Sequence, residues 1–473
     1  MAVKFITSHK NFIGLSTDAK PTEVNATVPI GSTFYEYDTK KTARLVNELA
    51  PVHYWPLERD LLDQAGTTTG SVTHAGTNRT RINPTSGLIE SVGANVPRYE
   101  SVGGKLATLI EPAGTNLCTD SEAFRAAISG WLNQNGTVTD NVVAAPDGNT
   151  TADKIVEAND IGQSHYIRDT IAKASFTDNA SVTFSVYLKP AERTFARIRF
   201  RLKDGNYREA YFNLSTGAMS GTEDASSYGS EQIGSSEWWR YWITHNIGNG
   251  ANDPMFFVYL AEADNDVIYN GDGSSGIYVW GAMVQESPVP TSYVATSGAT
   301  VTRATESGEP HFTLPAGLFD AEGTAIVWWR PGWDTQSIAA HSGIIAISNV
   351  STSLFYAHLS LNSIFSRDGF NSASRSLSFS ADTWYKLIIK WGYLVEGTKK
   401  FRVGIDSESG VSWGTEANFD GSYTLGANIR LGYTPFSRMH LRQLYLFPKV
   451  LSDDQINNWD GTKQNSTNWI RES

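Results

Sequence analysis

The run Gly276–Glu286, GIYVWGAMVQE, constrains the fold of this chain more than any other segment. Its residues alternate between two sets, of which one is Ile277, Val279, Gly281 and Met283 and the other is Tyr278, Trp280, Ala282 and Val284. A period of two is that of a β-strand, and apolar groups on both faces predict a strand in the middle of a sheet. Pro288 and Pro290 follow, and neither can donate to a neighbouring strand. The polar run 291–305 then predicts an extended exit, so this segment closes one β-domain and opens another.

Alternating runs of the same kind recur along the chain and predict an all-β protein. Between residues 116 and 303 they include SVTFSVYLKP, ARIRFRL, REAYFNL, EWWRYWITHNI and PMFFVYLAEAD. After residue 306 they include GTAIVWWRP, SGIIAISNV, LFYAHLSL, TWYKLIIKWG, KFRVGID and ANIRLGY. Turns rich in Gly, Asp and Asn separate them at the spacing of a β-sandwich. The abundance of glycine, with 41 residues, and of aromatic residues agrees with many short strands joined by turns.

The first 50 residues contain too few apolar side chains to bury a core of their own. We therefore expect an extended arm that docks on a partner, with a flexible leader as the alternative. A short strand is predicted at Ser32–Tyr37, and a short helix at Ala43–Leu49, which Pro51 stops. The segment 51–115 is predicted to be a β-rich connection, with a buried strand that includes Tyr54, Trp55 and Leu57.

The charge and the cysteine content of the chain exclude several kinds of partner and site. The net charge is −11, and the densest basic stretch, Arg193–Arg208, alternates with apolar residues as a solvated strand face does. We therefore expect no nucleic-acid partner. The single cysteine, Cys118, excludes an intrachain disulfide and a cysteine-based zinc site. No apolar run is long enough for a membrane span and the N-terminus lacks a signal-peptide core, so we expect no membrane insertion.

The sequence gives no positive sign of catalysis. It contains no H-E-x-x-H, no P-loop and no G-x-G-x-x-G after a strand. The nine histidines are scattered, and the paired carboxylates of the glucanase type, E-x-D-x-x-E, are absent. We therefore expect no catalytic residues and no enzymatic activity, with a polysaccharide depolymerase kept as the least favoured alternative.

Aromatic residues are the best candidates for ligand contact, because sugar rings stack their C–H faces on flat rings. Trp333 and Trp413 lie in turn-like surroundings, WRPGWDT and SGVSWGT. Further candidates are Tyr393, Trp131 and Tyr207, and the wider set of possible platforms adds Trp239, Trp242, Tyr356 and Trp391. For each ring, packing in the core is the alternative.

One cluster of oxygen-bearing side chains is a weak candidate for a calcium site. It lies in AEADNDVIYNGDGSSG and consists of Asp264, Asp266, Asn270 and Asp272. Its spacing is not that of an EF-hand loop, and ordinary turn chemistry is the alternative. No other cofactor is expected.

Several stretches resemble bacteriophage tail and virion-surface proteins. They are NFIGLSTDAKPTEVNATVPIGSTFYEYDTKK near the N-terminus, NVPR at Asn95–Arg98, LIEPAGTNL at Leu109–Leu117, APDGNTTADKI at 145–155, and the stretch 276–306 that ends in TVTRATE. The last of these resembles the end of a carbohydrate-binding-module-like jelly roll. The resemblance implies that the NVPR and LIEP stretches connect and brace modules.

The C-terminal part resembles the laminin-G/concanavalin-A-like lectin fold. The resemblance rests on TWYKLIIKWG, FRVGIDSESG, LGANIRLGYTP and MHLRQLYLFPKVLSDDQINNW, in that order. It implies a strand that starts at Trp384, a turn at Leu425-Gly426, and a closing strand at Leu441–Phe447. The helix that follows has Ser452 as its N-cap and Gln455 three residues later, which predicts a capping box.

Together these resemblances imply two jelly-roll or lectin-like β-sandwiches in tandem behind an extended N-terminal arm. The implied units are an arm at 1–50, a connecting segment at 51–115, a jelly roll at 116–305 and a laminin-G/concanavalin-A-like sandwich at 306–473. They imply a virion-surface protein, a tail fibre or receptor-binding protein, that presents its sandwiches to host-surface glycans. A capsid decoration protein or head fibre is the alternative.

The same resemblance implies the partners and the location. The arm would attach to other virion proteins of the tail, baseplate or capsid through Phe12, Ile13, Leu15, Phe34, Tyr35 and Tyr37. By analogy with phage fibres we expect a homotrimer. The protein would be made in the host cytoplasm and act on the virion surface.

Overall fold

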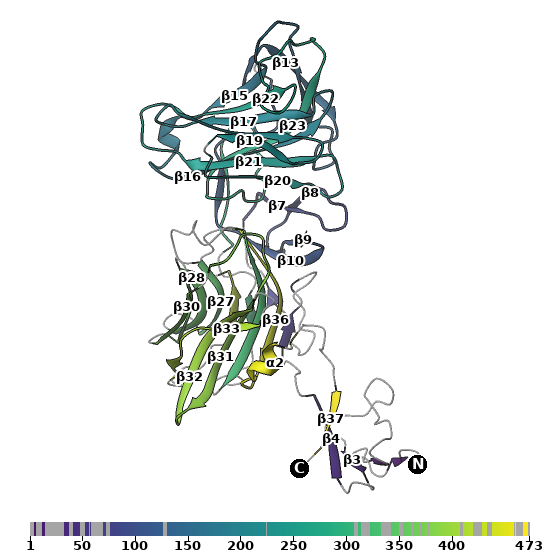
Figure 1. Ribbon diagram of the computed structural model, residues 1–473, viewed down its shortest axis with the longest axis vertical. Coiled ribbons are helices and arrows are strands. Elements are labelled where there is room, and N and C mark those ends of the chain that lie inside the picture. Colours follow the sequence, from purple (N-terminus) through teal and green to yellow (C-terminus); the bar gives the residue numbers. More distant parts are fainter. Residues whose placement is uncertain are drawn as a thin grey trace.

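The computed structural model shows an all-β chain, which confirms the predicted fold class (Figure 1). It describes residues 76–306 except 126–129 and 224, and 311–459 with gaps at 314–321, 333–341, 350–352, 361–362, 369–370, 377, 407–409, 420–427, 433–437 and 458. Before residue 76 it describes Leu57 and six short strands, and after residue 459 one strand. In these parts of the chain, no helix has the length and apolar character that crossing a membrane requires.

The first sandwich, drawn in teal in Figure 1, consists of two six-stranded antiparallel sheets. One sheet has the order β12 (Leu132–Gln134), β15 (Tyr166–Thr170), β22 (Met255–Ala261), β17 (Phe195–Arg201), β18 (Tyr207–Asn213) and β19 (Met219–Glu223). The other has the order β13 (Gly136–Val143), β14 (Ala152–Glu157), β23 (Gly276–Glu286), β16 (Ser181–Pro190), β21 (Trp239–Asn246) and β20 (Ser227–Gln232). A 3-10 turn, η1 (Lys173–Ser175), precedes β16.

The second sandwich, drawn mainly in green and yellow with β9 and β10 in blue, also has two sheets. The nine-stranded sheet has the path β33 (Val411–Trp413), β32 (Thr398–Asp406), β31 (Tyr385–Val395), β26 (Gly323–Pro331), β36 (Met439–Phe447), β10 (Lys105–Ile110) and β9 (Tyr99–Val102), with β34 (Ala417–Asn418) on β32 and β5 (His53–Trp55) on β36. The seven-stranded sheet has the order β30 (Ser372–Ser376), β29 (Ser363–Asp368), β28 (Ser353–Ser360), β27 (Ser342–Asn349), β35 (Asn428–Leu431), β25 (His311–Thr313) and β6 (Gly70–Ser71).

Three smaller elements tie distant parts of the chain together. The entry strand of the first sandwich, β11 (Gly114–Asn116), pairs with its exit strand, β24 (Val301–Arg303). The hairpin of β7 (Arg79–Ile82) and β8 (Ile89–Val92) lies beneath this sandwich (Figure 1). A five-stranded sheet has the order β1 (Lys4–Phe5), β2 (Phe12–Gly14), β3 (Thr33–Glu36), β4 (Lys41–Asn47) and β37 (Thr467–Arg471).

The second sandwich is therefore built from two separate parts of the sequence. Strands β5, β6, β9 and β10, from the segment predicted to be a connection, complete sheets whose other strands come after residue 310. Leu57 is fully buried in the core of this sandwich. The N-terminal region is likewise not a lone extended arm, because its strand β4 pairs with β37.

The structure corrects two local predictions and confirms a third. Residues 43–47 belong to strand β4 and not to a helix, because their backbone pairs with β3 and β37. In β23 the strict alternation breaks at Gly281, which has a φ of +62° beside a bulge opposite β16. The bulge moves Met283 to the face of Trp280. The predicted capping box of α2 (Asp453–Asn457) is present, since Gln455 N donates to Ser452 Oγ at 3.1 Å and Ser452 N to Gln455 Oε1 at 2.9 Å.

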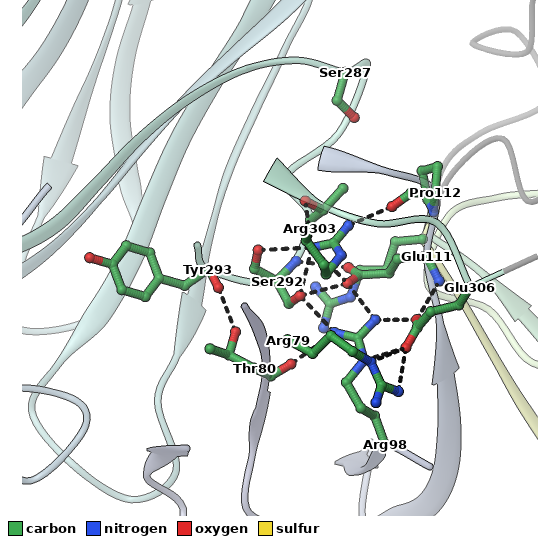
Figure 2. A network of polar contacts seen from close by, with 12 residues as sticks. Arg79, Thr80, Arg98, Glu111, Pro112, Ser287, Ser292, Tyr293, Arg303 and Glu306 are labelled. Carbon is green, nitrogen blue, oxygen red and sulfur yellow. Dashed lines mark hydrogen bonds and ion pairs between the residues drawn. The ribbon is translucent and has the colours of Figure 1, made fainter. Parts of the chain in front are cut away.

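A buried ionic network lies where the two sandwiches meet (Figure 2). It consists of Arg79, Arg98, Arg303, Glu111 and Glu306, none of which is more than 3% exposed. Arg98 is 2.9 Å from Glu111 Oε2 and forms a paired contact with both oxygens of Glu306. Arg79 contacts Glu306 at 2.7 Å, and Arg303 contacts Glu111 at 3.2 Å. We call this set the junction network.

Neighbouring groups form hydrogen bonds with most of the remaining donors and acceptors of the junction network. Ser292 donates from its backbone N to Glu111 Oε1 at 2.8 Å and from its hydroxyl to Oε2 at 2.6 Å. The guanidinium of Arg79 donates to the carbonyls of Gly93 and Val96, and that of Arg303 to the carbonyl of Pro112. Buried charges are stable only with such partners, so the network fixes the positions of the segments that supply it.

The two carboxylates stay ionised because arginines surround them. Burial alone would raise the pKa of Glu306, but the charge of Arg98 outweighs it and holds the pKa below its usual range. The pKa of Glu111 is likewise lowered, against burial, by Arg303 and Arg98. Nearby, burial would raise the pKa of Glu100, but a hydrogen bond with His440 and the charge of Arg438 lower it to about 2.

Neutralising Glu306 is expected to destabilise the junction strongly. The substitution Glu306→Gln leaves Arg79 and Arg98 buried with one carboxylate fewer, and the free energy of unfolding should fall by about 3–5 kcal/mol. Urea denaturation followed by circular dichroism measures this change. The matched control is Glu237→Gln, which removes an exposed 2.8 Å pair with Lys189 and should leave the midpoint unchanged. Equal midpoints for all three proteins would contradict the structural role of the network.

The same carboxylates predict how stability depends on pH. Their pKa values are lower in the folded than in the unfolded chain, so their contribution is complete above the unfolded value of about 4.3 and is lost as the pH falls toward the folded value. The free energy of unfolding should therefore be level from pH 7 to 5 and decline steeply below that. The decline should be shallower in Glu306→Gln, as urea titrations at pH 7, 5, 4 and 3 would show. A decline of equal steepness in both proteins would assign the acid sensitivity to other groups.

Candidate functional site

The outer face of one sheet of the first sandwich carries rows of aromatic and arginine side chains. In the first row Tyr166 pairs with Tyr259, Tyr259 with Arg197, and Arg197 with Tyr211, so the row crosses β15, β22, β17 and β18. Side chains alternate along each strand, and the residues between them, such as Ile198 and Val258, are fully buried in the core. Register therefore places this whole row on one face.

A second row lies beside the first on the same face. Phe257 is the cross-strand partner of both Arg168 and Arg199, and Arg199 in turn is paired with Glu209. Tyr207 and Arg201 pair one step further along. We call the set formed by both rows and this pair the arginine–aromatic face; its members are Tyr166, Arg168, Arg197, Arg199, Arg201, Tyr207, Glu209, Tyr211, Phe257 and Tyr259.

Guanidinium groups lie over the rings of this face. The Cζ atom of Arg197 lies 3.9 Å from the centre of the Tyr259 ring, and that of Arg199 lies 3.8 Å from the centre of the Tyr207 ring. Phe257 and Tyr259 are stacked with centres 5.7 Å apart. Such stacking holds long arginine side chains in a fixed orientation.

Glu209 fixes both arginines from the side. Its Oε1 is 3.2 Å from Arg197 and its Oε2 is 2.8 Å from Arg199, and Arg197 also donates to the hydroxyl of Tyr211 at 3.1 Å. The face includes four arginines against Glu209, whose cross-strand partner on β19 is a further glutamate, Glu223. Burial raises the pKa of Tyr166 and of Tyr211, so both phenols stay protonated and available as donors.

The face has a packed floor and an accessible surface. Phe257, Tyr259 and Tyr211 are 5–7% exposed because neighbouring side chains lie over them, whereas Tyr207 is 39% exposed. The covered rings hold the guanidinium groups in place, so this face offers a ligand charged hydrogen bonds from planar donors and the exposed part of the Tyr207 ring. The arrangement thus suits a flat, polar ligand that carries negative charge.

The sequence identified Tyr207 as a candidate but missed the residues around it. The sequence predicts a solvated strand face at Arg193–Arg208. Its alternation is confirmed, but Arg197 is only 7% exposed because Tyr259 and Tyr211 cover it. The missed signal is in β22, where Phe257 and Tyr259 occupy outward positions at which an antiparallel sheet normally has polar residues.

Trp131 has no ring face open to a ligand. It is 1% exposed in the core, packs against Phe124 with ring centres 5.0 Å apart, and donates from its indole N–H to the carbonyl of Asp120. Trp131 is therefore a core residue, which was the alternative to ligand stacking at this position. Trp333 lies outside the described residues.

The structure brings Tyr393 and Trp413 together on the outer face of the second sandwich. The Cζ atom of Arg402 lies 4.0 Å from the centre of the Trp413 ring and 5.6 Å from that of Tyr393. Lys390 lies 4.6 Å from the Trp413 ring centre, and its Nζ is 2.6 Å from Asp453 at the start of α2. These cations occupy ring surface that a sugar would need, and Asp453 also binds Arg402 at 2.9 Å. The cluster therefore fastens α2 to the sheet.

The proposed calcium ligands serve turns instead. The carboxylate of Asp272 accepts four hydrogen bonds from the backbone and hydroxyl groups of Ser274 and Ser275. Hydrogen bonds from Ser275 hold the pKa of Asp272 below its usual range. Asn270 accepts from Gly162, and Asp266 from Ile268, while Asp264 is exposed. Within the described part of the chain, no group of three or more His, Cys, Asp or Glu side chains is placed to hold a metal ion.

The residues predicted to attach the arm lie in the N-terminal sheet or beyond it. Phe12 and Ile13 belong to β2, and Phe34 and Tyr35 to β3, which pairs with β2 in parallel. The side chains of these four residues, and Leu15 and Tyr37 altogether, lie outside the described residues. Their proposed role stays a prediction.

Comparison with known proteins gives similarity to solved structures only. No protein-family model and no curated protein matches the chain. The binding domain of botulinum neurotoxin serotype D is 15% identical, with a TM-score of 0.24 over 33% of this chain and 41% of that chain. Domains LG4-5 of the mouse laminin alpha1 chain are 10% identical, with a TM-score of 0.21 over 62% of this chain and 92% of that chain.

A third similar structure is the CBM22-1–CBM22-2 tandem of Paenibacillus barcinonensis Xyn10C. It is 11% identical, with a TM-score of 0.23 over 71% of this chain and 98% of that chain. This chain spans about two fifths of the length of the neurotoxin domains that it matches. TM-scores this low carry no argument about the site, so its function is argued from its own geometry.

Proposed function

We propose that this chain is a glycan-binding protein of the bacteriophage virion surface, and that its arginine–aromatic face contacts acidic host-surface polysaccharide. The observation that carries the binding proposal is the fixed position of Arg197 and Arg199, each within 4 Å of a ring centre and each held by Glu209. A guanidinium held in this way binds a carboxylate or phosphate with little loss of side-chain entropy.

Charge supports an acidic ligand. The whole chain has a net charge of −11, which keeps it from adhering unspecifically to acidic cell envelopes, whereas this face has a local excess of arginine. A local positive surface on an acidic protein directs an anionic ligand to one place. We propose that the chain binds the polysaccharide without cleaving it.

The location on a virion rests on the sequence stretches that resemble phage proteins, above all the N-terminal one. We propose that the region of β1–β4 attaches to a tail, baseplate or capsid protein and that the assembled protein is a homotrimer. Mass photometry tests the oligomer, and immunogold microscopy of intact particles with an antibody to the second sandwich tests the location. Label on the tail would support receptor binding, and label over the head would favour a decoration protein.

The binding proposal predicts the effect of a double substitution, Arg199→Gln with Tyr207→Leu. Both side chains are partly exposed, so the variant should keep its fold while the ligand loses a charged donor and an exposed ring surface. Its affinity for polygalacturonate, measured by biolayer interferometry, should fall about tenfold or more. Wild-type binding should also weaken as salt is raised.

Arg125→Gln is the matched control, because Arg125 is 44% exposed, pairs with Asp140 at 2.7 Å, and lies off this face. It should bind as the wild type does. Single-stranded DNA, as a second anion, should bind more weakly than polygalacturonate, and no new reducing ends should form on incubation. Unchanged affinity in the double variant would remove the arginine–aromatic face from the proposal, and release of oligosaccharide would replace binding by hydrolysis.

A further inference from the structure

A cleft of about 1080 Å³ lies between the two sandwiches. One wall is formed by β20 and β21 of the first sandwich and the other by the end of β26, the loop 378–382 and the start of β36. Figure 1 shows β20 and β21 on the side of the first sandwich that is nearest to β9 and β10. The cleft is at the upper end of the volumes of ligand sites, which are roughly 300–1,000 Å³.

An aromatic platform lines the first wall. Trp242 on β21 is the cross-strand partner of Gly229 on β20, and its ring lies over that glycine. A Cβ atom at position 229 would be 2.4 Å from Cζ2 of the ring, so only glycine lets the ring lie flat on the edge strand. Trp242 is half-buried, and its neighbour Tyr228 is 40% exposed. Tyr228 is the cross-strand partner of Ile243, which lies in the core, so the Trp242 ring alone gives this wall an apolar surface that stays partly open to the cleft.

Charged groups on the second wall and the floor are held in fixed positions. Arg330 is 2.8 Å from the carboxylate of Asp382 and donates from Nε to the carbonyl of the same residue at 2.9 Å. Arg438 bridges Glu231 of the first sandwich, at 3.4 Å, and Glu100, at 3.2 Å. Asp382 and Glu231 remain 63% and 35% exposed, so both carboxylates can accept further hydrogen bonds.

The charges of this cleft balance, unlike those of the arginine–aromatic face. Arg330 and Arg438 stand opposite Asp382 and Glu231, and the rest of the lining includes serine hydroxyls from three separate segments, 101–103, 226–230 and 378–380. Rings, planar charged groups and hydroxyls without a net charge match the vicinal hydroxyls and C–H faces of a neutral sugar.

We propose that this cleft is a second carbohydrate site, which binds an uncharged oligosaccharide of several sugar rings stacked on Trp242. The site is separate from the arginine–aromatic face and takes a different class of glycan. Because its walls belong to different sandwiches, the bound chain bridges them and is contacted by Asp382 and Glu231 from opposite sides.

Two substitutions test the site without touching the junction network. Trp242→Ala removes the platform, and Asp382→Asn keeps a side chain that tolerates the φ of +60° at this position while it removes the charge. The probes are cellohexaose, maltohexaose, xylohexaose and chitohexaose, and the measurement is isothermal titration calorimetry with the full-length chain. Thermal unfolding of each variant checks that the fold is retained.

We expect the wild type to bind at least one neutral hexasaccharide, Trp242→Ala to lose about tenfold or more in affinity, and Asp382→Asn to lose severalfold. Both variants should bind polygalacturonate as the wild type does, and Arg199→Gln with Tyr207→Leu should keep the neutral ligand. If no hexasaccharide binds, or if both cleft variants bind like the wild type, the second site is overturned. Because the acidic ligand reports on the other face, that result leaves the proposed function to stand or fall by its own test.

Discussion

The contact of Glu306 and Glu111 with Arg79, Arg98 and Arg303 is the interaction on which the rest of the molecule depends (Figure 2). The five side chains come from segments that enter or leave the two sandwiches, and all are buried. An ionised group in such a place tolerates little displacement, because each lost partner leaves an uncompensated charge. The network therefore fixes the end of the first sandwich against the start of the second, and with it the width of the cleft between them.

The two proposed glycan surfaces differ because they face different surroundings. The arginine–aromatic face is the outer surface of a sheet, where Arg197 and Arg199 lie over rings and share Glu209. The cleft lies beside the buried junction, where Arg438 pairs with carboxylates from both sandwiches. Solvent stabilises the excess of positive charge on the arginine–aromatic face. In the cleft, which lies beside a buried region, positive and negative charges must balance. The charge distribution that keeps each surface stable thus also determines whether it binds an acidic or a neutral glycan.

Much of the fold could be predicted from local pattern. The alternating runs gave the strands β16, β17, β18, β21, β22 and β23, and the capping box of α2 is as Ser452 and Gln455 predicted. The phase change at Gly281 and the strand at residues 43–47 were not foreseen, because a bulge and a distant partner strand decide them. Tyr207 was found, but Tyr166, Phe257 and Arg197 join it only through strand order, which local pattern does not contain. The NVPR and LIEP stretches stand out in the sequence by resemblance alone, and in the structure their Arg98 and Glu111 are partners in the junction network.

The discontinuous construction of the second sandwich has a consequence for how the chain is made. Glu100 beside β10 meets His440 on β36, and these residues are 340 positions apart. At about 5–20 residues per second, β36 leaves the ribosome on the order of 20–70 s after β9 and β10. The first sandwich, which closes with β24, is complete well before that. Strands β5 and β10 meanwhile wait with unpaired edges, and the β36 of a neighbouring nascent chain fits them as well as their own. Closely spaced ribosomes on one mRNA therefore favour exchange of these strands between nascent chains. The yield of correctly assembled protein should fall as the spacing between ribosomes decreases.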